Sequence, residues 1–232
     1  MHPAGLTCTI TRDAATVRAA RALRHRVFVV ERGGAAGPEP GLEGGEHDAD
    51  CDHAVVTDPS HPEAGILATA RFREGTVWTD REFDVSVLAS RGLRVAEVGR
   101  TCVHPDFRGG LAGMTLFGGV IAALRARGVQ ALVGSASFPG RDAGSHMSAL
   151  RALRAAALAP PDWRPVARGS GAVRVEGCAP RAAMMGVPPL IKSYLRAGAW
   201  VGEGACVDAA FNVVDVCMVL DMARLRVPAG MT

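Results

Sequence analysis

The run EVGRTCVHPDFRGGLAG, which begins at Glu97, joins a predicted strand to a predicted helix. A turn of this kind aims several backbone N–H groups at one point, and the positive end of the helix dipole adds to them. Gly109, Gly110 and Gly113 can adopt positive φ angles, and Arg108 supplies a fixed cation. The pattern predicts a site for a phosphate or another anion, although strand, glycine turn and helix also occur together as a plain connection.

Glu97 and Arg100 form a charged pair on the strand that precedes this turn. Three positions apart, they lie on opposite faces of a regular strand unless a bulge lies between them. A buried carboxylate can take the proton of an attacking amine directly or through water, since an α-amino group has a pKa of about 8. We therefore predict that Glu97 is a general base and that Arg100 organises the carboxylates around an acceptor. An ion pair that only fixes the strand is the alternative.

Cys102 and Val103 end the same predicted strand. Attack on an acyl group develops an oxyanion, which needs hydrogen-bond donors that are placed beforehand. We expect the backbone N–H groups near these two residues to supply them. A covalent acyl-enzyme on the Cys102 thiol is the alternative, and the lack of a histidine or another base at a useful spacing disfavours it.

Three further charged residues are candidates for the acceptor side of a site. Arg71 is a lone charge in the apolar run ILATARF, so it needs either an internal carboxylate or the carboxylate of a substrate, unless it lies at a solvated strand end. Asp48 and Asp52 lie in the run EHDADCD, where they could bind a cationic side chain or belong to a solvated acidic loop. Neighbouring His47 and Asp50 do not give the run the spacing of a metal site, so we expect no metal.

These residues must be positioned by alternating strands and helices. An apolar stripe predicts that the first helix follows Asp13 as its cap and buries one face. Strands that pair as hairpins near the start and alternate with helices later predict a mixed α/β sheet in a single domain over residues 1–232. The expected strands are 6–11, 53–57, 66–73, 94–103, 131–137 and 213–220, the expected helices are 14–31, 114–127, 145–158 and 188–198, and irregular segments are expected at 33–45, read as a mobile loop, and 162–177. The buried face of the first helix is expected to contain Val17, Ala20, Leu23, Val27 and Val30.

The composition is that of a globular protein, with 48% hydrophobic and 21% charged residues. A net charge of +3 without a basic block argues against nucleic acid as a partner. The six cysteines form no CxxC pair, which predicts free thiols in a reducing compartment. Because neither a signal peptide nor a long apolar segment is evident, we expect a cytoplasmic protein, with peripheral contact to the inner membrane left open.

The turn V-x-P-x-x-R-G-G after a strand resembles the acyl-carrier turn of the GNAT superfamily. The resemblance implies a mixed central sheet flanked by helices, with a bulge near Glu97 and two strands that splay at the acyl-pantetheine site. Where the superfamily has Gly-x-Gly-x-Gly, this chain reads Gly-Gly-Leu-Ala-Gly, which favours a donor with a single phosphodiester over the pyrophosphate of coenzyme A. The residues implied to bind acyl-pantetheine are Cys102, Val103, Arg108, Gly109, Gly110, Ser137 and Phe138; plain strand packing is the alternative for the last two.

Longer blocks, among them LRHRVFVVERG, DADCDHAVV, ATARFRE, PPLIKSYLRAGAWVGEGACVD and FNVVDVCMVLD, resemble the ornithine N-acyltransferases over residues 15–222. The resemblance implies transfer of a 3-hydroxyacyl chain from acyl carrier protein to the α-amine of ornithine, which gives lyso-ornithine lipid. The donor substrate would be the carrier's phosphopantetheine thioester, with no permanently bound cofactor. Arg26 and Glu31 match the opening block and are expected to help fold the following loop over the substrate. Arg26 is therefore predicted, with Asp48, Asp52 and Arg71, to bind the acceptor.

Four other functions remain open. An N-acyl amino acid synthase would share the site and differ in its acceptor. A homoserine-lactone synthase is disfavoured because its expected tryptophan after the VF pair is missing. The glycine spacing disfavours an acetyl-coenzyme A enzyme. Retention of Glu97, Arg100 and Arg71 argues against a non-catalytic binding module.

Overall fold

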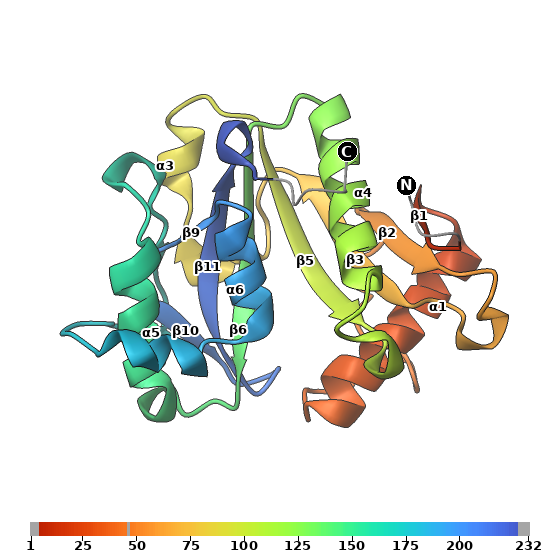
Figure 1. The fold of residues 1–232 in the computed structure, drawn as a ribbon, viewed down its shortest axis with the longest axis horizontal. Helices are drawn as coiled ribbons and strands as arrows, with labels where there is room; N and C mark the ends of the chain where they lie inside the picture. The colour runs from red at the N-terminus through yellow and green to blue at the C-terminus, as the bar shows by residue number, and fades with distance from the viewer. Residues whose placement is uncertain (1–4, 46, 227–232) are drawn as a thin grey trace. The chain divides into compact units, whose positions relative to one another are not determined.

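The computed structural model describes residues 5–45 and 47–226, and the chain divides into two compact units. Of the described residues, the first unit takes those up to Arg73 together with Val98–Gly128, and the second takes Glu74–Glu97 and residues 129–226. Each unit combines strands and helices, which confirms the predicted mixed α/β class (Figure 1). The single domain expected over residues 1–232 stays a prediction.

In the first unit the strand order is β1-β2-β3-β5, and the β1–β2 and β2–β3 pairs are antiparallel, as the hairpin pattern predicts. Helix α4 covers β1 and β2, and Gly128 ends it with a φ of 70° (Figure 1). The elements are β1 Thr7–Thr11, α1 Ala14–Arg24, η1 His25–Glu31, β2 Asp52–Thr57, η2 Pro62–Ala64, β3 Ala68–Glu74, η3 Pro105–Phe107 and α4 Ala112–Ala126. Strand β5 spans Val95–Val103, and its part from Val98 onward belongs to this unit.

The predicted first helix is correct in extent, but its last turns, η1, are a π-helix. Asp13 caps α1 as expected, because its carboxylate accepts a hydrogen bond from the Thr16 N–H at 2.8 Å. Ala20, Leu23 and Val27 are buried, whereas Val30 is 70% exposed, so its placement on the buried face was wrong. The wider turn of a π-helix shifts the phase of the face, which a regular 3.6-residue period cannot follow.

In the second unit the strand order is β5-β6-β11-β10-β8, with β9 also paired to β11. The start of β5 pairs in parallel with β6 from Val95↔Ala131 to Glu97↔Val133, and β6 pairs antiparallel with β11. A separate two-stranded sheet joins β4 to β7. The elements are α2 Thr79–Glu82, β4 Phe83–Asp84, α3 Ser86–Ala89, β6 Ala131–Pro139, α5 Ala143–Ala157, η4 Pro161–Trp163, β7 Val166–Ala167, β8 Ala172–Val173, η5 Arg181–Gly186, α6 Pro189–Arg196, β9 Trp200–Val201, β10 Ala205–Asp208, β11 Val213–Asp221 and η6 Met222–Arg224.

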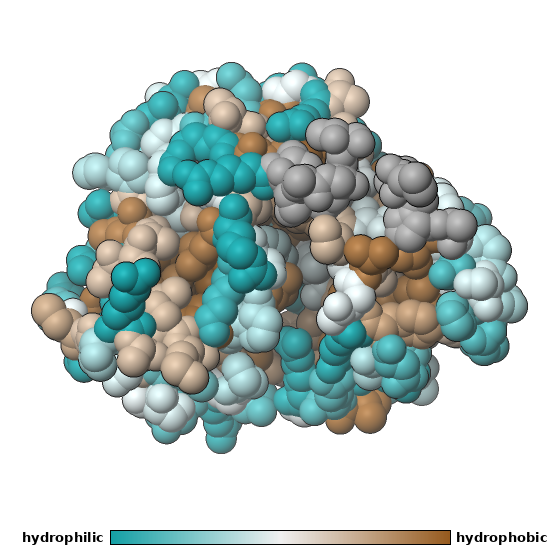
Figure 2. All heavy atoms as spheres, in the orientation of Figure 1, coloured by the Kyte–Doolittle hydropathy of each residue, from teal (hydrophilic) through white to brown (hydrophobic). Residues whose placement is uncertain are grey.

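Each unit has its own apolar core. In the first, Ala20, Leu23 and Val27 pack with Val55 and Cys102. In the second, the core is built around Phe83, Leu88, Val133, Trp163 and Val219. Hydrophobic residues are interspersed with hydrophilic ones on the face shown in Figure 2. None of the helices among the described residues combines the length and hydropathy that crossing a bilayer requires.

Candidate functional site

The predicted anion turn is well defined in the first unit. Gly109 has a φ of 76°, which glycine adopts without strain. Leu111 precedes α4 as its N-cap and supplies no side-chain acceptor to the helix N–H groups. A Cβ added to Gly110 or Gly113 would meet only ordinary contacts, at 3.6 and 3.5 Å. Internal packing therefore does not require these two glycines, and a ligand approaching the turn gives a reason for them.

An open hollow of about 460 Å³ lies beside this turn. Its lining combines the turn with the residue before β1 and the β2–β3 connection, and consists of Leu6, Asp58, His61, Asp106, Phe107, Arg108, Gly110, Leu111 and Ala112. The hollow belongs wholly to the first unit. Space for a ligand is thus present next to Arg108 and the start of α4.

Arg108 itself is held by Glu31 at the end of η1. Its two Nη atoms donate to the two Glu31 oxygens, each at 2.6 Å, and its Nε donates to the Val103 carbonyl at 3.3 Å. The hydrogen bond from Arg108, supported by its charge, lowers the pKa of Glu31. Nearby, Arg26 approaches Nε2 of His104 to 2.6 Å and remains half-exposed.

Strand β5, which bears Glu97 and Arg100, is irregular at Arg100. Arg100 has a φ of 54°, an uncommon conformation for a residue other than glycine and one that occurs at strand bulges. Regular face alternation therefore does not continue through Arg100. The resemblance implied such an irregularity. The local sequence alone does not predict it, because position 100 is an arginine and not a glycine.

Glu97 is completely buried in the second unit and serves as an acceptor for backbone N–H groups. Its Oε2 accepts from Val77 at 2.8 Å and from Trp78 at 3.3 Å, and its Oε1 accepts from Thr79. The carboxylate thereby fixes the segment that opens α2. Since a carboxylate offers about four lone-pair directions, capacity for a proton remains, and the role of Glu97 as a base stays a prediction.

A buried network of charges occupies the first unit. Arg24, fully buried on α1, donates to both oxygens of Asp48 at 2.9 and 2.5 Å, and its Nε lies 2.7 Å from Glu43. Arg71 donates to Asp48 at 2.9 Å, and Arg100 donates to Glu43 at 2.8 Å. Two carboxylates thus hold three guanidinium groups drawn from α1, β3 and β5 at 2.9 Å or less, and a fourth, that of Arg21 on α1, lies 3.7 Å from Asp48.

The electrostatics of this network follow from burial and pairing. Burial opposes ionisation of Asp48, but hydrogen bonds and charges from Arg24 and Arg71 outweigh it and hold the pKa of Asp48 well below its usual range. Burial, with the charge of Arg100, lowers the pKa of Arg71. Burial also lowers the pKa of His53, consistent with a neutral ring whose Nε2–H donates to the Asp48 carbonyl at 3.0 Å.

The network provides the internal anion that Arg71 requires, namely Asp48. Asp52 is held by Arg12 at 2.7 Å and by Arg127 at 2.6 Å. Arginines thus already contact both aspartates predicted to bind the acceptor. The acceptor-binding roles of Arg26, Asp48, Asp52 and Arg71 stay predictions, now with known internal partners.

Sequence reasoning did not single out Arg24 and Glu43 as site residues. The signal for Arg24 was available, because it lies four positions after buried Ala20 and three before buried Val27, on the apolar face of α1. Glu43 offered no such periodicity, since it lies in the irregular segment after η1. Its contacts with Arg24 and Arg100 identify it.

Cys102 is buried at the end of β5, and burial raises the pKa of its thiol to about 12. At neutral pH the thiol is therefore protonated, and only the thiolate is a strong nucleophile. This supports the prediction that Cys102 acts through its backbone and not as the carrier of an acyl group.

The two predicted pantetheine residues of the second unit lie on β6. Ser137 pairs with Asp215 of β11, and Phe138 is fully buried and pairs with Val214. Their binding role stays a prediction. Among the described residues, the carboxylates of Glu82, Asp208 and Asp215 come within 4.8 Å of one another, but Ser135 already donates to Glu82, and we assign no ion to them.

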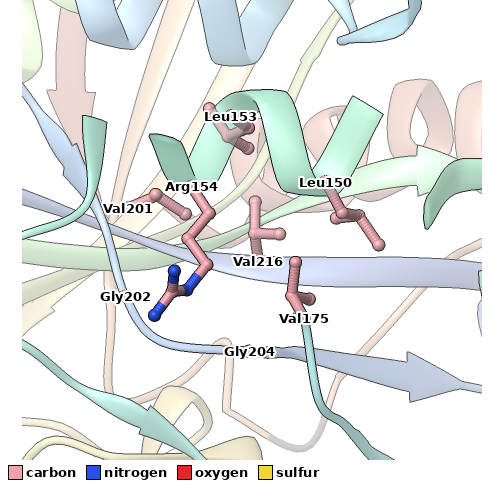
Figure 3. A pocket seen from close by; sticks show the side chains of 8 residues that line it. All are labelled: Leu150, Leu153, Arg154, Val175, Val201, Gly202, Gly204 and Val216. Carbon is pink, nitrogen blue, oxygen red and sulfur yellow. The ribbon is translucent and has the colours of Figure 1, made fainter. Parts of the chain in front are cut away.

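A small cavity of about 10 Å³ lies in the second unit, between α5 and the strands around β9 (Figure 3). Its walls are mainly apolar, and the Arg154 guanidinium pairs with Glu203 at 2.7 Å. The volume suits about one water molecule. It is a packing gap and not a substrate pocket.

Known proteins are similar in sequence to this chain over nearly its whole length. A model for the acetyltransferase (GNAT) domain matches residues 23–117. The L-ornithine N(alpha)-acyltransferase of Rhodobacter capsulatus is 39% identical, and the match covers 94% of this chain and 91% of that protein. The protein of the same name from Brucella abortus is 31% identical, with 95% and 85% covered.

Solved structures share the fold. A putative N-acetyltransferase from Lactobacillus plantarum has a TM-score of 0.53 at 17% identity, covering 94% of this chain and 99% of that chain. A CoA-dependent acyl-homoserine lactone synthase has a TM-score of 0.56 at 15% identity, covering 95% and 84%. These similarities confirm the predicted GNAT-like α/β fold.

Replacement of Arg24 tests the buried network. In Arg24→Met two buried carboxylates lose a shared cation, so the free energy of unfolding should fall by about 3–5 kcal/mol. Arg18→Met is the control, because Arg18 lies on the same helix and forms an exposed pair with Glu39, worth about 0–1 kcal/mol. Urea unfolding followed by circular dichroism measures both, and equal losses would contradict a special role for Arg24.

Replacement of Cys102 tests the backbone role. Cys102→Ala should keep kcat within a few-fold of the wild type, because the protonated thiol takes no part in chemistry. Treatment of the wild type with iodoacetamide at pH 8 should label the exposed Cys178 and spare Cys102, as read by peptide mass spectrometry. An acyl group found on Cys102 after incubation with donor would overturn this assignment.

Proposed function

Since the chain belongs to the L-ornithine N(alpha)-acyltransferase family, we propose that it transfers a 3-hydroxyacyl chain from acyl carrier protein to the α-amine of ornithine. The product would be lyso-ornithine lipid. The observation that carries the proposal is the agreement with enzymes of this name over almost the entire chain. No permanently bound cofactor is needed, because the donor brings its own thioester.

The donor side of the proposed site is the turn after β5. The N-terminal N–H groups of α4, the open space at Gly110 and the cation of Arg108 suit one phosphodiester, and the hollow beside them leaves room for it. A carrier-bound phosphopantetheine has one such group, whereas coenzyme A has a pyrophosphate. The Gly-Gly-Leu-Ala-Gly spacing supports the carrier, with Ser137 and Phe138 proposed along the pantetheine arm.

In the proposed reaction the neutral α-amine attacks the thioester carbonyl. The new C–N bond forms, the proton of the amine passes to Glu97 directly or through water, and the C–S bond breaks as the pantetheine thiolate leaves and is protonated. Backbone N–H groups near Cys102 and Val103 would stabilise the oxyanion. Because Glu97 is buried, its charge acts in a medium where electrostatic interactions are stronger than in bulk water.

On the acceptor side we propose Arg26, Asp48, Asp52 and Arg71. Arg71 would attract the ornithine carboxylate, and the aspartates would attract its side-chain ammonium. Each group already has an internal partner, so the bound acceptor would share these charges. A cytoplasmic location, with peripheral contact to the inner membrane, is part of the same proposal.

The function is tested with purified protein, carrier charged with 3-hydroxyacyl chains and a panel of amines. Thiol release should depend on ornithine, and mass spectrometry should identify the α-N-acyl product. Lysine and tyrosine serve as acceptor controls, and acetyl-coenzyme A serves as donor control. Equal rates with unrelated amino acids, or release from acetyl-coenzyme A alone, would defeat the proposal.

Glu97→Gln tests the base. Loss of proton transfer should lower kcat by roughly 10²–10⁴-fold, while carrier binding is retained. Glu74→Gln is the matched control, because it changes a half-exposed carboxylate paired with Arg94 near the start of the same strand. The melting temperature is measured in parallel, since Glu97 also holds residues 77–79 in place. Unchanged kcat, or residual activity that keeps the acid limb of the wild-type pH profile, would refute the base assignment.

A further inference from the structure

The cation of the donor turn is occupied by a residue of the protein itself. Arg108 meets Glu31 through two parallel hydrogen bonds, each 2.6 Å long, and both side chains are about two-fifths exposed, at 41% and 39%. Glu31 is the last residue of the π-helix η1, far from Arg108 in sequence. The pair is therefore a tertiary contact at the surface of the turn.

A carboxylate and a phosphodiester present the same feature to a guanidinium group. Each offers two anionic oxygens that can accept the parallel N–H groups of arginine. Only one such partner can occupy this edge of Arg108 at a time. Because the Arg108–Glu31 pair is exposed, water and salt screen it, and an arriving phosphate can displace the carboxylate at little cost.

We propose that Glu31 is an internal competitor for the donor's phosphate, occupying on Arg108 the place that the phosphodiester takes when acyl carrier protein binds. The inference rests on the proposed function, because it assumes a phosphate-bearing donor at this turn. Glu31 is thus a residue that sets donor affinity through Arg108. It does not touch the reacting atoms.

The competition affects only donors that carry a phosphate. A phosphopantetheine donor must displace Glu31 to reach Arg108, whereas an acyl thioester without phosphate leaves the pair intact. When Glu31 leaves, η1 keeps the contacts that Arg26 makes with the turn, at 2.6 Å to His104 and 3.9 Å to Asp106. The π-helix is therefore not released from the turn, and the effect of Glu31 is confined to the binding of the donor.

Steady-state kinetics of the full-length chain test the proposal. In Glu31→Gln the KM for 3-hydroxyacyl carrier protein should fall roughly two- to fivefold, the range expected when an exposed ion pair no longer competes, with kcat unchanged. With the N-acetylcysteamine thioester of the same acyl chain, which has no phosphate, KM should not change. In an Arg108→Gln background, Glu31→Gln should have no effect.

The control for net charge is Glu39→Gln, which removes a carboxylate of similar exposure that pairs with Arg18 and Arg21 away from the turn. It should leave both KM values as in the wild type. An unchanged or raised KM for the carrier in Glu31→Gln overturns the competition and leaves the proposed function standing. A wild type that does not use carrier-bound donor refutes the proposed function, and the competition with it.

Discussion

The first unit depends on one buried cation. Arg24 is fully buried, and its charge is balanced by Asp48 and Glu43, which in turn hold Arg71 and Arg100. Moving such ions out of water costs several kcal/mol each, so the arrangement persists only while every partner is in place. Helix α1, the segment before β2, and strands β3 and β5 are thereby held in register by charge as well as by apolar packing.

The same unit contains ion pairs of a different strength. Those at Arg24 are excluded from water, whereas the Arg108–Glu31 pair is two-fifths exposed. Screening makes an exposed pair worth little, while a buried carboxylate without its partner is strongly unfavourable. The protein thus has a buried set of charges on the predicted acceptor side and an exposed pair at the predicted donor turn. Under the proposed function, the exposed pair would suit a carrier donor that must bind and leave.

The regular elements could be predicted because their signals are local. Short alternating or apolar runs predicted β1, β2, β3, β5, β6 and β11, and Asp13 caps the first helix as expected. Elements fixed by distant contacts could not be predicted this way: α2 begins where Glu97 accepts N–H groups from residues 77–79, and the π-helix shifts Val30 into solvent. The residues of the donor turn followed from sequence, whereas the partners of Asp48 and Glu43 required the fold.

Strand β5 carries two residues whose chemistry depends on that long-range order. Glu97 is useful as a base only if its carboxylate is fixed, and three backbone N–H groups fix it without contributing a competing side-chain cation. Arg100 departs from strand geometry, with its φ of 54°, and donates to Glu43. Such a conformation persists where surrounding contacts over-determine it, and the Glu43 ion pair is one of them. The departure from regular β structure is therefore maintained by the same buried network that fixes Asp48 and Arg71, which links the geometry of β5 to the predicted acceptor side of the site.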